Sequence, residues 1–211
     1  MRLVVGFVLF LLAGNLLIVA AWGVAHATAP GTDPPEVPGV PNLQVVDEQV
    51  WRGAAPSEEG YRSLARYGVT TVVDLRAEEG AIRREPVLRE LGIRHVSIAL
   101  RDGQTPTRGQ VDRFLRAIRR SKGVVFVHCG AGVGRTGAMS AAYLVSSGGA
   151  SAGQALRRNL AVGPPSLEQI AFVADFDSDD VERPSWAVTA VSRLLDAPRR
   201  LWTRLRVADL F

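Results

Sequence analysis

Residues 124–137 read V-V-F-V-H-C-G-A-G-V-G-R-T-G, and the interpretation of the whole chain starts from them. The apolar residues 124–127 predict a buried strand that ends just before Cys129, the single cysteine of the chain. A glycine-rich loop follows, and Arg135 begins a segment with helical composition. A loop of small residues between a strand and a helix N-terminus can turn consecutive backbone N–H groups toward an anion, which the helix dipole also favours. The stretch therefore predicts an anion-binding cradle with Cys129 at its floor.

The side chains of this cradle suit the chemistry of a phosphate ester. A guanidinium group such as that of Arg135 can bind two phosphate oxygens in a bidentate fork. The thiolate is the nucleophilic form of cysteine, and the helix dipole, the loop amides and Arg135 all favour that anion at Cys129. These two residues together predict a cysteine-dependent phosphatase.

The pattern H-C-x-x-G-x-x-R-T at residues 128–136 resembles the protein tyrosine and dual-specificity phosphatase superfamily. The resemblance implies that Cys129 is the nucleophile, Arg135 the phosphate clamp and Thr136 the hydroxyl that helps the thiolate leave. It implies that His128 supports the loop by hydrogen bonding, and that no metal or other cofactor is required. The phosphate-binding residues that it implies are Gly130, Ala131, Gly132, Val133, Gly134 and Arg135.

A general acid is expected upstream, because the departing alkoxide or phenoxide is a poor leaving group unless it is protonated. Asp102 follows a predicted strand on a glycine-containing loop and resembles the mobile acid of the family. A simple Asp-Gly turn is the structural alternative for this residue, and Asp74 is the second candidate for the acid. Gln169 matches a glutamine that some phosphatase families place near the hydrolytic water, but we expect a surface residue here.

Three other motifs overlap the same stretch and fit less well. Residues 132–137 match G-x-G-x-x-G, but Arg157 and Arg158 stand where a dinucleotide fold would need an acidic residue. A Walker A loop is excluded because Lys122 is the single lysine and no G-K-[ST] occurs. A Cys–His dyad is excluded because adjacent residues of a strand point to opposite faces.

Strand-like and helix-like segments alternate along the chain, which predicts an α/β fold. We expect a central, mostly parallel sheet of about four to five strands with helices on both faces, similar to a dual-specificity phosphatase. The phrase from Trp51-Arg52-Gly53 to residues 72–76 resembles the N-terminal half of bacterial and plant-type members, with Arg76 as a structural ion-pair partner. The segments expected as strands are 43–46, 50–52, 70–75, 93–100 and 124–127. The segments expected as helices are 57–67, 83–91, 110–120, 136–147, 151–160 and 166–176.

Four regions are expected from composition. Residues 1–27 are a transmembrane anchor or signal segment, because 3–25 are almost wholly apolar and long enough to span a bilayer. Residues 28–41 are a Pro-rich, extended linker, and 42–180 are the phosphatase domain. Residues 181–211 are a basic amphipathic tail that Pro198 divides into two short helices, lying on an anionic membrane surface or docked on the domain.

The sequence thus predicts a membrane-anchored hydrolase of phosphomonoesters that acts on phosphoprotein or on a small phosphomonoester. Arg2 precedes the apolar segment and acidic residues follow it, which favours an extracytoplasmic domain; secretion after cleavage near Ala27 and a cytoplasmic domain are the alternatives. Alternative activities are hydrolysis of inositol phosphates or phosphoinositides, and phospho-binding with weak catalysis. The formal charge of +4 comes from arginines spread over the chain, so no nucleic-acid partner is expected.

Overall fold

The computed structural model describes residues 2–29, 35–77 and 86–208. A five-stranded sheet runs through the centre of the domain, in the order β1-β2-β5-β3-β4. Only β1 and β2 are antiparallel, and the other pairs are parallel. The strands are β1 (Gln44–Val45), β2 (Val50–Gly53), β3 (Val69–Arg76), β4 (Arg94–Leu100) and β5 (Val124–His128). The predicted α/β fold with a mostly parallel sheet is confirmed.

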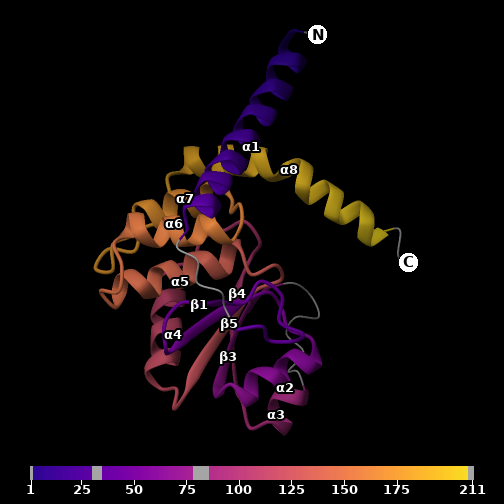
Figure 1. Ribbon diagram of the computed structural model, residues 1–211. Helices are drawn as coiled ribbons and strands as arrows, with labels where there is room; N and C mark the ends of the chain where they lie inside the picture. Colours follow the sequence, from indigo (N-terminus) through magenta and orange to yellow (C-terminus); the bar gives the residue numbers. More distant parts are fainter. Residues whose placement is uncertain (1, 30–34, 78–85, 209–211) are drawn as a thin grey trace.

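Helices cover both faces of this sheet (Figure 1). One face packs against α2 (Glu58–Arg66) and α3 (Pro86–Glu90), and the other packs against α4 (Arg108–Arg119) and α5 (Gly134–Ser146). Helices α6 (Ala152–Val162) and α7 (Leu167–Ala174) pack against α5. The middle residues of β5, 125–127, are fully buried, as expected for a parallel strand with helices on both sides.

Local sequence signals explain where the helices begin. The Ser57 side chain accepts a hydrogen bond from the Gly60 amide at the start of α2, as its position before the apolar pattern predicts. Thr107 and Gln110 form a capping box at the start of α4. Along α4, Val111, Phe114 and Ile118 are buried at helical spacing, so this helix turns one apolar face to the sheet.

The expectation of a linker over 28–41 is wrong for the part that the structure describes. Val37 and Val40 are buried and belong to the apolar cluster that α2 and α3 form with the sheet. The segment is held there by backbone bonds, because the Gly39 carbonyl accepts from the Ser57 amide and the Pro41 carbonyl accepts from the Ala54 amide. Two buried apolar side chains and two backbone hydrogen bonds therefore anchor it. Residues 30–34 lie outside the described residues.

The tail is a single helix, α8 (Trp186–Ala208), so the expected break at Pro198 is wrong. A helix loses one backbone hydrogen bond at a proline, and the carbonyl left over belongs to Leu194, whose side chain is on the exposed side of α8. The first half of α8 docks on α7, where the Ser192 hydroxyl accepts from the Glu168 amide at 3.1 Å. From residue 198 to residue 208 the structure describes the backbone of α8 but not the side chains, so the basic face expected there stays a prediction.

The N-terminal helix α1 (Arg2–Thr28) projects from the domain at its N-terminal end (Figure 1), and its middle and C-terminal parts pack on α8 and α6. Contacts with the domain include a hydrogen bond from Asn15 Nδ2 to the Leu195 carbonyl at 3.2 Å and one between His26 Nδ1 and the Ala161 carbonyl at 3.0 Å. Gly14 permits this crossing, because a Cβ there would overlap the side chain of Leu195.

Replacing Phe114 by alanine tests the packing of α4 on the sheet. Phe114 is fully buried, so Phe114→Ala should lower the free energy of unfolding by about 3–5 kcal/mol. The exposed neighbour on the same helix provides the control, since Arg119→Ala should change it by less than about 0.5 kcal/mol. Urea denaturation of the two variants measures both values, and equal losses would contradict the assignment of this helix face.

Candidate active site

The loop that follows β5 turns its carbonyl oxygens away from Cys129. The oxygens of four consecutive residues, 130–133, accept hydrogen bonds from the segment around β2. The donors are the Ala55 amide to Gly130 (3.1 Å), Asn42 Nδ2 to Ala131 (2.9 Å), and the Arg52 guanidinium to Gly132 (2.8 Å) and Val133 (3.2 Å). Because the carbonyls are held outward, the amides of the loop are free to point inward.

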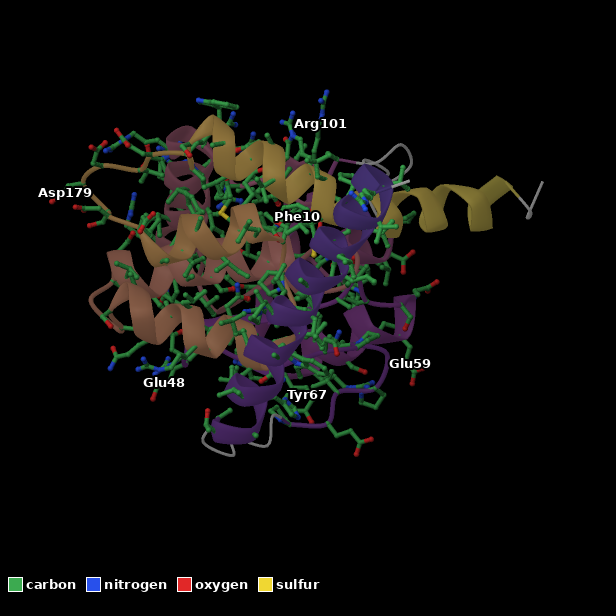
Figure 2. The ribbon with its side chains drawn as sticks, turned by 90° about the horizontal axis from the view of Figure 1, so that it is seen from above. Phe10, Glu48, Glu59, Tyr67, Arg101 and Asp179 are labelled. Atoms are coloured by element: carbon green, nitrogen blue, oxygen red, sulfur yellow. The ribbon has the colours of Figure 1, made fainter. Side chains whose placement is uncertain are left out.

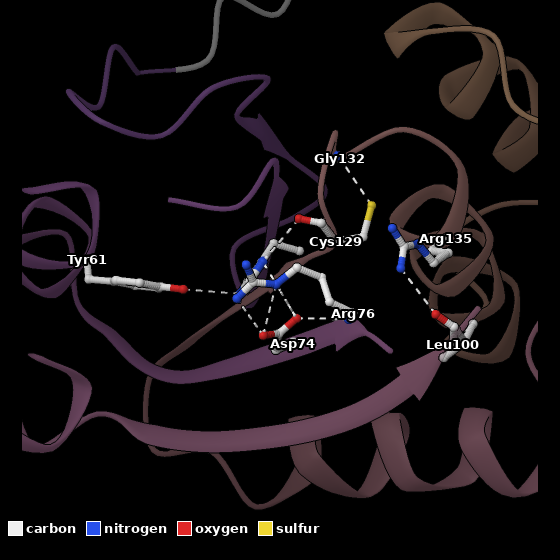
Figure 3. A network of polar contacts seen from close by, with 8 residues as sticks. Tyr61, Asp74, Arg76, Leu100, Cys129, Gly132 and Arg135 are labelled. Atoms are coloured by element: carbon white, nitrogen blue, oxygen red, sulfur yellow. Dashed lines mark hydrogen bonds and ion pairs between the residues drawn. The ribbon is translucent and has the colours of Figure 1, made fainter. Parts of the chain in front are cut away.

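The cysteine thiol lies at the centre of this loop. The Gly132 amide donates to Cys129 Sγ at 3.3 Å, as Figure 3 shows. Gly132 has φ of +75°, and a Cβ at that position would overlap the backbone of Gly53, so glycine is required on both counts. Cys129 is buried, and α5 begins at Gly134 with its N-terminus toward the loop. One amide of the loop, that of Gly132, therefore points toward the sulfur, as the predicted cradle requires.

Arg135 connects the cradle to the end of β4. Its NH1 group donates to the Leu100 carbonyl at 3.1 Å (Figure 3), and its Nε lies 3.5 Å from Asp102 Oδ1. The Arg135 side chain is almost fully buried, whereas that of Asp102 is 52% exposed. The predicted clamp and the predicted acid are thus neighbours, with the carboxylate on the solvent side.

Two buried side chains complete the α5 side of the cradle. The Thr136 hydroxyl is inaccessible to solvent and has no hydrogen-bond partner among the residues that the structure describes. Gln169 lies so close that a Cβ on Gly134 would overlap its Oε1 atom. The expectation of a surface glutamine is wrong, because Gln169 is 2% exposed and sits at the N-terminus of α7, against the loop.

His128 is fully buried and belongs to a chain of polar contacts next to Cys129. Its Nε2 lies 3.4 Å from the Tyr61 hydroxyl, and its Nδ1 lies 3.3 Å from the Cys129 carbonyl and 4.0 Å from Asp74. A neutral ring that donates from Nδ1 and accepts at Nε2 satisfies both hydrogen bonds. Burial lowers the pKa of His128 to about 4, against the opposing effect of Asp74. The ring is therefore neutral near pH 7 and orients the backbone at Cys129.

Asp74, the second candidate for the acid, is committed to an ion pair. Arg76 binds it in a bidentate manner, with Nε to Oδ1 at 3.0 Å and NH2 to Oδ2 at 2.8 Å. Burial acts to raise the pKa of Asp74, but the hydrogen bonds and the charge of Arg76 oppose it, and the pKa is lowered. The structural role predicted for Arg76 fits this geometry.

The loop that carries Asp102 is bound to the N-terminus of α7. The Ser166 hydroxyl donates to the Gly103 carbonyl at 2.9 Å, and Gln169 Nε2 donates to the Gln104 carbonyl at 3.2 Å. Gln169 therefore contacts both the loop that carries Asp102, called the acid loop below, and Gly134 at the end of the loop that follows Cys129, called the cysteine loop. The sequence does not reveal these contacts.

Sequence reasoning also missed a role for Arg52 and Asn159. Both side chains are buried, and both Arg52 terminal nitrogens lie 3.3 Å from Asn159 Oδ1. The available signal was an arginine inside an apolar strand, in the Trp-Arg-Gly phrase.

Within the described residues, no three His, Cys, Asp or Glu side chains are grouped so that they could hold a metal ion.

Comparison with known proteins places this geometry among phosphatases. Residues 35–184 match the family described as PTP-NADK, DSP-PTPase phosphatase fused to NAD+ kinase. A human protein, the dual specificity protein phosphatase CDC14C, is 35% identical over 79 residues, which are 37% of this chain and 17% of that protein. The chain thus spans about a sixth of the length of this relative.

Solved structures share the fold over most of the domain. The active form of Tk-PTP has a TM-score of 0.55 with 26% identity, covering 62% of this chain and 92% of that one. The catalytic domain of the PP-IP phosphatase SIW14 from S. cerevisiae has a TM-score of 0.58 with 17% identity, covering 68% and 90%. The second likeness concerns the fold alone.

The buried His128 predicts a loss of stability in mild acid. In the unfolded chain His128 binds a proton at its usual pKa of 6.5, whereas in the folded chain its pKa is about 4. Stability that is complete above about pH 6.5 should therefore fall as the pH approaches 4, by about 2 kcal/mol at pH 5. Denaturation at several pH values measures this slope.

This dependence of the free energy of unfolding on pH should come from His128 alone. His128→Gln removes the titrating ring and should flatten the dependence between about pH 6.5 and 4, whatever its effect on stability at pH 7. The exposed His26 is the control, and His26→Gln should keep the slope. A slope that survives His128→Gln would contradict the assignment.

Proposed function

Because the chain belongs to the DSP-PTPase phosphatase family, we propose that it hydrolyses phosphomonoesters through a phosphocysteine at Cys129. The observation that carries the proposal is the loop with four outward carbonyls around a buried thiol. Amides that point inward stabilise the three non-bridging oxygens of a phosphoryl group, and Arg135 stands beside them to bind two of these oxygens. The loop residues that would form this contact are 130–135.

The first step transfers the phosphoryl group to sulfur. Cys129 Sγ attacks phosphorus in line with the ester oxygen, the S–P bond forms, and the P–O bond to the leaving group breaks. The leaving oxygen takes its proton from the Asp102 carboxyl group, which lies at the solvent side of Arg135. The position of Asp102 beside the clamp supports it as the acid, whereas Asp74 is held by Arg76.

The second step returns the enzyme to its starting state. A water molecule attacks the phosphocysteine, Asp102 accepts a proton from it, and the S–P bond breaks to give inorganic phosphate and the thiolate. The Thr136 hydroxyl has no other partner in the described part of the chain and is available to donate to the departing sulfur. Gln169, buried against the loop, is suited to orient the water.

We assign the substrate class as phosphoprotein, with phosphotyrosine and dual-specificity activity as the main proposal. The loop residues between Cys129 and Arg135 are neutral, so the cradle carries no extra cation for a polyanionic headgroup. Inositol phosphates are the alternative, and the shared fold with a PP-IP phosphatase favours their inclusion as substrates in the assay. Release of phosphate from a phosphotyrosine peptide, a phosphoserine peptide and an inositol polyphosphate separates the two.

We propose further that α1 anchors the enzyme in a membrane. Its segment Val4–Thr28 is long and apolar enough to cross a bilayer, and a signal sequence can have the same length and composition. Figure 2 shows the molecule from above, with α1 in front of the domain and Phe10 labelled on it. Residues 11, 14, 18, 22 and 25 form the less exposed face, toward α6 and α8, while large apolar side chains on the other faces are exposed. The position of Arg2 before the apolar segment favours an orientation with the catalytic domain outside the cytoplasm.

Substitution of the nucleophile and the acid tests the mechanism. Cys129→Ser should lower hydrolysis of 4-nitrophenyl phosphate by about a thousandfold or more, since the hydroxyl is a far weaker nucleophile. Asp102→Asn should lower hydrolysis of an alkyl phosphate by about a hundredfold, but that of 4-nitrophenyl phosphate by less than about tenfold. The exposed Asp180→Asn is the matched control and should retain full activity.

Equal rates for the wild type and Cys129→Ser would refute the enzymatic proposal and leave a phospho-binding module. An Asp102→Asn effect that does not depend on the leaving group would place the acid elsewhere.

Charges placed on the exposed face of α1 test the anchor. Phe10 and Leu17 are 46% and 71% exposed in the structure, so Phe10→Arg with Leu17→Arg should leave the domain folded. Each arginine at the centre of a spanning helix costs about 2.5–3.5 kcal/mol, and the double variant should leave the membrane fraction after carbonate extraction. The surface variant Arg62→Met should stay there, and wild-type protein in the supernatant would contradict the anchor. A compartment-sensitive reporter fused after Pro41 tests the orientation.

A further inference from the structure

A second arginine lies directly behind the phosphate cradle. The Arg52 side chain comes from β2 and is 4% exposed. Its NH2 group donates to the carbonyls of Gly132 and Val133 at 2.8 and 3.2 Å, on the side of the loop opposite to that of the proposed substrate. The remaining contact is Asn159 Oδ1, 3.3 Å from both terminal nitrogens.

This guanidinium has no carboxylate beside it in the part of the chain that the structure describes. Its side-chain partner is the neutral amide of Asn159, and its other partners are backbone carbonyls. A buried cation without an anionic partner is costly, and burial lowers the pKa of Arg52 to about 10. The influence that opposes burial is the negative charge of Cys129. The electrostatic interaction of two groups is mutual, so a cation that Cys129 stabilises in turn favours the thiolate.

Asn159 lies at the position where a negatively charged residue would neutralise the charge of Arg52. It lies on α6 with 1% of its surface exposed. The adjacent turn of α5 has Gly137, where a Cβ would overlap Asn159 Oδ1, so the backbone permits the amide to reach Arg52. An aspartate has the same shape and would form an ion pair with the guanidinium. The asparagine holds Arg52 in place and leaves its positive charge uncompensated.

We infer that Arg52 is a positioning residue of the phosphatase reaction, whose buried charge stabilises the Cys129 thiolate through the loop, and that Asn159 maintains that charge. Arg135 and Arg52 then act from opposite sides of one loop. The first contacts the substrate, and the second holds the carbonyls outward and supplies a fixed positive potential. The inference rests on the proposed function, because it assumes that Cys129 reacts as a thiolate.

Two substitutions at Asn159 separate charge from position. Asn159→Asp keeps the shape and adds a negative charge, whereas Asn159→Leu removes the hydrogen bond without adding charge. The rate of alkylation of the full chain by iodoacetamide is followed from about pH 4 to 9, since only the thiolate reacts. Asn159→Asp should move the midpoint of this profile upward by about one pH unit, which is about tenfold slower alkylation on the acid side. Asn159→Leu should move it much less.

Substitutions of Arg52 give the second measurement. Arg52→Met removes the charge and should raise the midpoint of the alkylation profile as Asn159→Asp does. Arg52→Lys keeps the charge, so its midpoint should lie close to that of the wild type. The exposed Arg62→Met is the control and should match the wild type. A thermal melt of each variant identifies those that are folded.

The outcomes distinguish the inference from the function beneath it. A wild-type midpoint that is low and unchanged in folded Asn159→Asp and Arg52→Met overturns the role of Arg52 but leaves the phosphatase proposal standing. Equal shifts in Asn159→Leu and Asn159→Asp overturn the electrostatic role too, because position would then explain both. A wild-type midpoint near that of an ordinary thiol, about 8.5, would overturn the proposed nucleophile itself and this inference with it.

Discussion

The outward orientation of four loop carbonyls is the constraint on which the site depends. A short loop cannot turn its amides toward an anion unless its carbonyls find donors on the other side, since unpaired buried carbonyls are costly. Those donors come from β2 and its flanking residues, which lie beside β5 in the sheet. The parallel pairing of β2 with β5 therefore does more than build the sheet. It brings an amide, an asparagine and an arginine beneath the loop at the positions where its carbonyls emerge.

The second face of the site depends on α7. The N-terminus of this helix carries a capping box in which Gln169 Oε1 accepts from the Ser166 amide. The same two side chains also bind the carbonyls of Gly103 and Gln104, in the acid loop. A local capping signal thus has a tertiary function, because its side chains bind the acid loop by hydrogen bonds and Gln169 also packs against Gly134 at the end of the cysteine loop.

Much of the fold was predictable because its signals are local. Apolar runs, the Ser57 and Thr107 caps and the alternation of strand and helix predict the elements and the mostly parallel sheet. The Cys-to-Arg spacing predicts the cradle, because one short loop joins Cys129 to Arg135 at the start of α5. Residues whose partners are distant in the sequence were misjudged or missed. Gln169 contacts residue 104, Arg52 contacts residues 132, 133 and 159, and Val37 is buried by α2, so no local pattern shows their roles.

The binding of the acid loop to a helix cap has a consequence for the timescale of the site. A turn that is free in solvent rearranges in nanoseconds to microseconds. The turn after β4 cannot move away from the cradle without breaking the bonds from Ser166 and Gln169, and the same two side chains also cap the first turn of α7. Opening of the acid loop therefore removes one hydrogen bond from each of the two side chains that cap α7. We therefore expect the amide hydrogens of the acid loop and of the first turn of α7 to exchange together rather than as two independent segments.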